Sequence, residues 1–325
     1  MSTQKVNAQK SKTVKSNNSI ALQNNTWKNI KEAWQLYVLL LLPVIYIIVF
    51  AYFPMYGVQI AFKKYSTSKG ITGSPWVGLR YFKFLKQKEF IQAFVNTITV
   101  SVYSLVASFP VPIILALGLN VMRNKAFKKT VQMVSYLPHF ISTVVMIGIL
   151  TQFFNTKVGL FKQILEIFLP GFKYSTSPMG SARAFSHLYV WSGVWQNMGW
   201  STIIYLAALA NVDAEQTEAA LIDGATRFQR VIHIDFPAIL PTAIILLIMN
   251  VGQIMNVGFE KVLLMQTDTN LTKSQIISTF SYKRGLVQQQ FETGAAIGLF
   301  NSVINLVLLI CVNAISKKVS ETSLW

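Results

Sequence analysis

The residues that could recognise a polar ligand in this sequence are aromatic rings and amides embedded in apolar stretches. In the segment LYVWSGVWQNMGWSTIIYL, Trp191 and Trp195 are four residues apart and share one face of a helix. Asn197 and Trp200 lie close by. Aromatic faces stack on the C–H faces of sugar rings, and amides hydrogen-bond hydroxyl groups. The segment predicts part of a solute pathway or, more simply, tryptophans that anchor a helix at a membrane surface.

A second group of amides occurs farther along the chain. Asn250, Gln253 and Asn256 recur near one helical face, with Glu260 after them. Polar groups in an apolar environment are costly unless they are satisfied, so these amides should face the interior of a helical bundle. They predict either contacts with a transported solute or hydrogen bonds between helices.

A short polar stretch, EAALIDGATRFQRVIHIDFP at Glu218–Pro237, separates two apolar runs. Asp213 is a good helix start, and Gly224 ends that helix because glycine tolerates the left-handed conformation. Thr226 and Gln229 have the spacing of a capping box for a second short helix. We therefore expect a small helical elbow here, against the alternative of an ordinary solvated loop.

Other kinds of chemistry find no support in the sequence. No G-x-x-x-x-G-K-[ST] phosphate loop occurs, so the chain is not expected to bind ATP in that manner. His139, His187 and His233 are scattered without metal-ligand spacing, and the single cysteine, Cys311, permits no internal disulfide. No arrangement for nucleophilic catalysis stands out. We expect no enzyme activity, no metal and no cofactor in this chain itself.

The polar groups must be positioned by helices that cross a membrane. Of the 325 residues, 52% are hydrophobic and only 13% are charged, which is too apolar for an ordinary soluble domain. A spanning helix needs about 20 mostly apolar residues. Six segments qualify, at 37–62, 91–118, 131–154, 186–210, 237–259 and 293–316. We predict an all-α polytopic membrane protein with six transmembrane helices over residues 37–325.

The residues 1–36 before the first span form a polar, Lys-rich tail that is too long for a secretory signal peptide. We predict that the tail is largely disordered and that the first span is a retained anchor. Near the end of the tail, Trp27, Ile30 and Trp34 recur at helical spacing beside lysines. This pattern indicates a short helix at an anionic membrane surface.

The distribution of charge gives an indication of orientation. Lys and Arg are almost equally numerous on the two sides of the predicted spans, so their count does not decide. The basic tail and the compact stretch Arg123–Lys129 favour an N-terminus in the cytoplasm, and six spans then place the C-terminus there too. The outer loops carry 15 basic and 5 acidic residues in this orientation, whereas the inner loop around Glu218 is net negative.

The elbow resembles the EAA signature of bacterial ABC importer permeases, which reads Glu-Ala-Ala, three residues, Gly, nine residues, Ile-x-Leu-Pro. The matching positions are Glu218, Ala219, Ala220, Gly224, Ile234 and Pro237, with Phe236 in place of the usual Leu. Further similar stretches are FPMYGVQIAF (53–62), SPWVGLRYF (74–82), YLPHFIST (136–143) and the segment 199–229. Together they resemble the LplB-like branch of the MalF-type carbohydrate permeases over nearly the whole chain after the tail.

The resemblance implies the type I permease fold of an ABC importer in a bacterial cytoplasmic membrane. The loop at 211–236 would hold the coupling helix, which docks in a cleft of an ATPase subunit. Its coupling residues would be Glu218, Ala219, Ala220, Asp223, Gly224 and Ala225. The implied partners are a second related permease, two ATPase subunits, an extracellular solute-binding protein, an oligosaccharide and membrane lipid, with no nucleic acid. ATP and Mg would bind to the ATPase subunits.

Several interpretations of the solute remain open at this stage. The positive outer loops motivate the hypothesis of an acidic oligosaccharide that contains uronic acid or sulfate. The same lysines could instead dock an acidic solute-binding protein or reflect a Lys-rich proteome. A permease for another solute, such as peptides, has the same architecture. An autonomous channel or ion-coupled carrier is a different class, and the absence of charged residues from the span cores disfavours proton coupling.

Overall fold

The structure, a computed structural model, describes residues 31–171 and 174–320. It divides into two units, Met1–Tyr56 and Gly57–Trp325. The predicted disordered tail, with Trp27 and Ile30 of its expected interfacial helix, lies outside the described residues apart from 31–36.

The described part of the first unit is a single apolar helical run. α2 spans Trp34–Ile47, continues through a π-helical turn, η1, at Ile48–Tyr52, and passes into α3 at Phe53–Met55. The most apolar window of the run Trp34–Phe62 contains no buried residue. A helix that exposes apolar side chains on all sides requires lipid or another protein around it. This agrees with the predicted span at 37–62.

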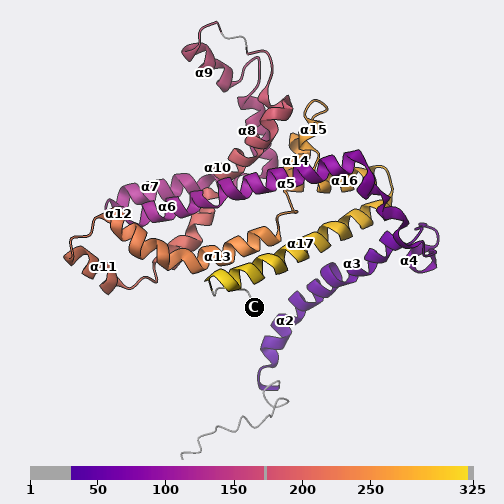
Figure 1. Ribbon diagram of the computed structural model, residues 1–325, viewed down its shortest axis with the longest axis horizontal. Helices are drawn as coiled ribbons and strands as arrows, with labels where there is room; N and C mark the ends of the chain where they lie inside the picture. Colours follow the sequence, from indigo (N-terminus) through magenta and orange to yellow (C-terminus); the bar gives the residue numbers. More distant parts are fainter. Residues whose placement is uncertain (1–30, 172–173, 321–325) are drawn as a thin grey trace, which may run out of the picture. The chain divides into compact units, whose positions relative to one another are not determined.

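The second unit is a helical bundle built around α10 (Ala182–Leu209) (Figure 1). α10 packs against α5 (Lys88–Ser108), α6 (Pro110–Asn120) and α13 (Phe236–Gly252). α17 (Phe291–Ser320) packs along α13. At Gly252 a Cβ atom would lie 2.6 Å from a methyl group of Leu309, so the bare glycine allows these two helices to approach closely.

The number of spans can be compared with the prediction. Four runs in the described part are long and apolar enough to cross a bilayer: Trp34–Phe62, Lys88–Asn120, Arg227–Gly252 and Phe291–Lys318. A bent helix pair at 125–153 can supply a fifth. α10 has 28 residues, hence a length of about 42 Å, but is less apolar because of its amides. The all-α polytopic class is confirmed, and these elements are consistent with six spans.

The third predicted span, 131–154, is not one straight helix. α7 (Lys125–Tyr136) runs into a 3-10 turn, η4, at Leu137–Phe140, and α8 (Thr143–Phe153) leaves at an angle of 101° (Figure 1). Pro138 cannot donate a backbone hydrogen bond, which weakens the helix at this point. Ser142 then caps the new helix by accepting a hydrogen bond from the Val145 amide.

The fifth predicted span, 237–259, extends beyond the C-terminal end of the helix that the structure shows. α13 stops at Gly252, and residues 253–258 are not helical before α14 begins at Phe259 and ends at Met265. Apolar composition alone gave no sign of this break. Hydrogen bonds of the polar side chains around residue 256 hold the unwound segment, as described below.

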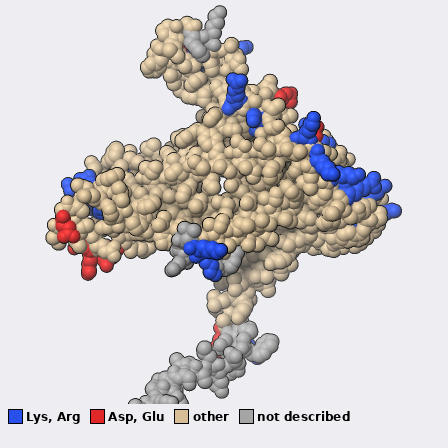
Figure 2. Space-filling view, viewed as in Figure 1, with Lys and Arg blue, Asp and Glu red and all other residues tan. Residues whose placement is uncertain are grey.

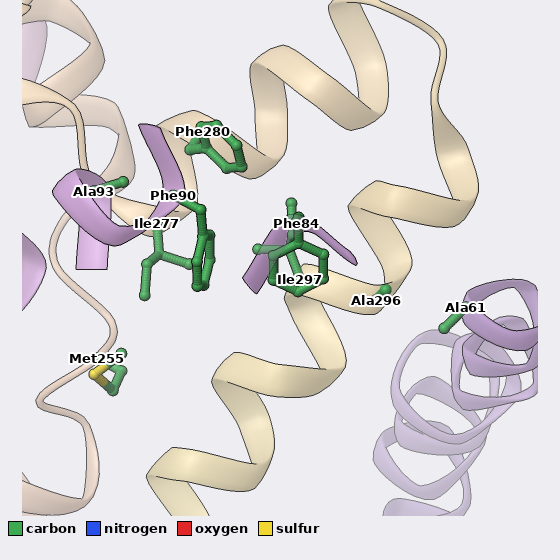
Figure 3. Packing of buried hydrophobic residues seen from close by; sticks show 9 residues of the cluster. All are labelled: Ala61, Phe84, Phe90, Ala93, Met255, Ile277, Phe280, Ala296 and Ile297. Atoms are coloured by element: carbon green, nitrogen blue, oxygen red, sulfur yellow. The ribbon is translucent and has the colours of Figure 1, made fainter. Parts of the chain in front are cut away.

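At the end of the bundle away from residues 211–236 lie several short elements and an aromatic cluster (Figure 1). These elements are η2 (Tyr56–Phe62), α4 (Gly70–Gly73), η3 (Gly78–Lys86), α15 (Leu271–Ser274), α16 (Ile277–Tyr282) and η7 (Lys283–Val287). Phe84 of η3, Phe90 of α5 and Ile297 of α17 meet in the cluster, with the rings of Phe84 and Phe90 4.6 Å apart (Figure 3). The close packing fixes the start of α5 relative to the start of α17.

Candidate functional site

The elbow predicted at 211–236 forms a helix–turn–helix at one end of the bundle (Figure 1). α11 spans Ala214–Ile222 and is capped by Asp213, whose carboxylate accepts a hydrogen bond of 2.9 Å from the Glu215 amide. Gly224 has a φ of +77°, the left-handed conformation expected of a helix-ending glycine.

The second half of the elbow also has the expected geometry. α12 spans Arg227–Arg230 and begins with the capping box of Thr226 and Gln229. The Gln229 side chain accepts from the Thr226 amide at 2.8 Å, and the Gln229 amide donates to the Thr226 hydroxyl at 3.3 Å. A π-helical turn, η6, at Val231–Asp235 joins α12 to α13. The cap of α11 and the capping box of α12 give each short helix of the elbow a defined start.

The predicted coupling residues lie on the surface of this elbow. Glu218, Ala219, Asp223 and Gly224 are exposed, and Ala220 and Ala225 are half-buried. Acidic side chains gather at this end of the second unit (Figure 2). The elbow also exposes apolar side chains that the sequence did not predict. These are Leu221, Ile222 and Phe228, and Ile222 is exposed by 87%. Exposed apolar side chains on a polar loop indicate a surface that another protein covers.

An ion pair ties the elbow to α13. Asp235 is fully buried, and its carboxylate lies 3.3 Å from Nε of Arg230. Nη2 of Arg230 donates a long hydrogen bond of 3.5 Å to the other carboxylate oxygen. A buried carboxylate without a cation would be strongly unfavourable, so Arg230 fixes the end of α12 against the start of α13.

A cavity of about 700 Å³ opens in the middle of the second unit. Its walls come from the junction of α5 and α6, the break between α7 and α8, α10, α13 and α14. The polar lining includes His139, Ser142, Gln196, Asn197, Ser201, Asn250, Glu260 and Lys261. A second cavity of about 240 Å³ shares five lining residues with it. The helix breaks at 141–142 and 253–258 therefore border the same polar space.

The predicted pathway amides divide between the two cavities. Asn197 lines the larger cavity, Asn250 lines both, and Gln253 and Asn256 line the smaller one. The Asn250 side chain is exposed, and among the described residues only the backbone carbonyl of Asn250 takes part in a hydrogen bond outside the helix ladder. A polar group in this condition is available to a ligand.

Asn256 has a different environment, because its side chain holds the unwound segment to α17. Its carbonyl oxygen accepts hydrogen bonds from the Asn301 and Asn305 amides at 2.9 and 3.1 Å. Its own amide donates to the Gln253 carbonyl oxygen at 2.6 Å, and the Met255 backbone amide donates to Asn305 at 3.2 Å. Asn256 therefore makes the hydrogen bonds to another helix that the sequence analysis offered as the alternative to solute contact.

The three predicted tryptophans do not line either cavity. Each is about half exposed. The Trp191 indole donates to the Tyr103 hydroxyl at 2.8 Å, and the Trp200 ring stacks on His139 with centroids 4.5 Å apart. Trp195 has neither kind of contact among the described residues. A pathway role for these rings stays a prediction.

Sequence reasoning missed two cavity residues, Tyr189 and Lys261. The Tyr189 hydroxyl accepts from the Gly258 amide at 3.1 Å, which fixes the end of the unwound segment against α10. Nζ of Lys261 donates to the Tyr189 carbonyl at 2.9 Å and lies 4.8 Å from the centre of its ring. α14 is outside the spanning runs, and burial lowers the pKa of Lys261 to about 8, which leaves the side chain charged at neutral pH. The break at 253–258, which the hydropathy of the sequence does not indicate, brings this lysine to the cavity.

Comparison with known proteins agrees with this arrangement. The family described as binding-protein-dependent transport system inner membrane component matches residues 108–321. Protein LplB of Bacillus subtilis (strain 168) is 40% identical over 91% of this chain and 92% of LplB. The polygalacturonan/rhamnogalacturonan transport system permease protein YteP of the same organism is 38% identical over 89% of this chain and 90% of YteP.

A solved structure gives the same relationship. A chain of a bacterial ABC transporter involved in the import of the acidic polysaccharide alginate superimposes with a TM-score of 0.82 and 35% identity, covering 91% of this chain and 99% of that one. The alginate transporter has also been solved in complex with an alginate pentasaccharide-bound periplasmic protein. The resemblance to LplB-like permeases is confirmed, and this multi-pass membrane chain belongs to the family of binding-protein-dependent transport system inner membrane components.

Proposed function

We propose that this chain is the permease subunit of an ATP-driven importer of acidic oligosaccharides. The observation that carries the proposal is similarity over about nine-tenths of the chain to permeases whose names specify polygalacturonan/rhamnogalacturonan and alginate. Both kinds of relative handle polymers of acidic sugars. Coverage of nearly the full length of each relative means that the cavity-forming helices are included.

The cavity has a composition that suits a hydroxyl-rich solute. Serine, asparagine and glutamine side chains from α5, α10 and α13 face a common space. These groups can hydrogen-bond either water or sugar hydroxyls, so replacing water by a sugar costs little free energy. The volume of about 700 Å³ is within the range of small-molecule binding sites.

The distribution of charge supports the proposed substrate. Basic side chains gather at the end of the second unit that carries η3 and the start of α5, away from the acidic elbow (Figure 2). With the elbow and both termini in the cytoplasm, the basic end is the outer mouth. A positive field at the mouth raises the local concentration of an anionic solute.

The elbow supports the ATPase partners that the proposal includes. Its exposed apolar side chains and rigid caps suit docking into a cleft of an ATPase subunit, where ATP and Mg would bind. The proposed partners are therefore two ATPase subunits, a second permease and an extracellular solute-binding protein. The chain itself holds no cofactor in this scheme and acts by alternating access.

The substrate class can be tested by comparing uptake of an oligogalacturonide with uptake of its carboxyl-reduced neutral analogue. We expect preferential uptake of the charged sugar, and a selective decrease for it between low and high salt, because ions screen a surface field over about 10 Å. Equal salt sensitivity of both sugars would assign the lysines to docking of the binding protein. Preferential uptake of the neutral analogue would contradict the acidic-sugar proposal.

A matched pair of amides tests the cavity. Asn250→Ala should lower uptake severalfold with normal assembly, because it removes a free ligand group worth about 1 kcal/mol. Asn256→Ala should lower the amount of assembled importer, since it leaves the Asn301 and Asn305 amides unpaired. Uptake per assembled complex and thermal stability distinguish the two effects. Wild-type uptake with Asn250→Ala would remove Asn250 from the pathway.

A further inference from the structure

Lys261 is a cation in the cavity wall whose charge is not paired with a carboxylate. The ion pairs between described side chains join Lys162 to Glu166, Arg230 to Asp235 and Arg284 to Glu89. Lys261 is in none of them, and no carboxylate of a described residue lies within 4.0 Å of its Nζ. Within residues 31–171 and 174–320, its one side-chain hydrogen bond is the one that Nζ donates to the Tyr189 carbonyl.

The position of the ammonium group is well defined. The Tyr189 carbonyl and ring hold it from one side. Gly193 makes room on α10, because a Cβ atom there would lie 3.2 Å from Nζ of Lys261. Tyr189, Gly193 and Lys261 all line the larger cavity. The cation is thus held at the cavity wall in a fixed place.

The chemistry of this group specifies its ligand. An ammonium group has three N–H donors, and the carbonyl of Tyr189 uses one of them. Removing a cation from water is costly unless an anion compensates for it. A carboxylate that entered the cavity would accept the free donors in a charge-assisted hydrogen bond, which is stronger than a bond between neutral groups.

We propose that Lys261 binds a carboxylate of the transported sugar and determines the preference for acidic over neutral oligosaccharides. The inference rests on the proposed function and adds a specific recognition residue to it. Glu260 lines the same cavity, but its side chain is exposed, so solvent screens its repulsion of a substrate carboxylate. The lysines of the outer loops act at a distance, whereas Lys261 acts by contact.

The test compares two sugars on each variant of the assembled importer. Uptake of an oligogalacturonide and of its carboxyl-reduced analogue is measured for wild type, Lys261→Gln, Lys261→Met and Lys261→Arg. We expect Lys261→Gln and Lys261→Met to lower the charged-to-neutral ratio about tenfold or more, and Lys261→Arg to retain most of it, because a hydrogen bond to a charged group is worth about 1.5–3 kcal/mol. The change in this ratio relative to wild type does not depend on expression, and the selectivity of the binding protein cancels because the same binding protein is used throughout. Residual uptake of each sugar is sufficient to obtain it.

Lys63 provides a matched control. Its Nζ donates to the Ile71 carbonyl at 2.8 Å and lies 4.9 Å from the Trp76 ring, but it does not line the cavity. Lys63→Gln removes one charge from the outer loops without altering the cavity, so it should change the charged-to-neutral ratio far less than Lys261→Gln does. Equal loss of both sugars in Lys261→Gln would make Lys261 a packing residue and overturn the inference, with the acidic-sugar proposal intact. A wild type without preference for the charged sugar would instead contradict the proposed function.

Discussion

Replacement of Gly224 by Val is expected to uncouple sugar uptake from ATP hydrolysis while the protein still inserts into the membrane. Gly224 has a φ of +77°, and among the described residues no atom beyond Gly224 and its two chain neighbours lies within 4 Å of the place where its Cβ would be. The penalty is therefore strain of the backbone and not a steric clash with a neighbour. Strain of this kind costs about 1–3 kcal/mol, which lowers the population of the native turn roughly fivefold to a hundredfold. α11 would then be misaligned with its docking partner.

The control for Gly224→Val is Gly224→Asn, because asparagine adopts the left-handed conformation more readily than other non-glycine residues. Uptake and ATP hydrolysis are measured on the assembled importer at matched expression. We expect the asparagine variant to keep most of the coupled uptake. Normal uptake by the valine variant would remove the coupling role from this segment.

Replacement of Arg230 by Met is expected to destabilise the protein by about 3–5 kcal/mol, because it leaves the carboxylate of Asp235 buried without a cation. The double variant Arg230→Met with Asp235→Leu should recover much of this loss, since two apolar groups of similar volume need no compensation. Thermal unfolding of the purified complex gives both values. The double variant also separates stability from coupling, because it restores packing without the electrostatic link between elbow and α13.

The exposed pair of Lys162 and Glu166 on α9 (Leu160–Phe168) is the matched control for the buried pair. Its atoms are 3.4 Å apart, as close as those of the buried pair, but both side chains are solvated. Lys162→Met should change stability by no more than about 1 kcal/mol. A similar small effect for Arg230→Met would show that Asp235 does not depend on Arg230.

The helical class and the elbow followed from the sequence because their signals are local. Long apolar runs require a membrane, and Asp213, Gly224, Thr226 and Gln229 each act on the backbone within a few residues. The capping box and the left-handed glycine were accordingly confirmed in detail. The exposed apolar residues of the elbow were not predicted, since Ile222 reads as an ordinary helix residue until its surroundings are known.

The cavity could be predicted only in part because it depends on contacts between distant segments. Asn250 was found by the rule that polar groups face the bundle interior, and Asn197 was found because amides beside tryptophans suit a sugar. The breaks at 141–142 and 253–258 escaped the hydropathy pattern, which continues through both. Because the hydropathy pattern extends the fifth span to residue 259, Lys261 was assigned to an outer loop. The break at 253–258 instead places its side chain against α10. The amides of α17 that hold this break lie 45 and 49 positions from Asn256.

In the proposed function, this chain transports an acidic oligosaccharide only as part of an ATP-driven complex. The most direct measurement is uptake of a labelled oligogalacturonide into vesicles that contain the chain alone or together with the second permease and the ATPase subunits, with solute-binding protein outside and ATP inside. We expect uptake only when all components and ATP are present. Flux through the chain alone, without ATPase subunits or ATP, would contradict the proposed function and identify an autonomous channel or carrier.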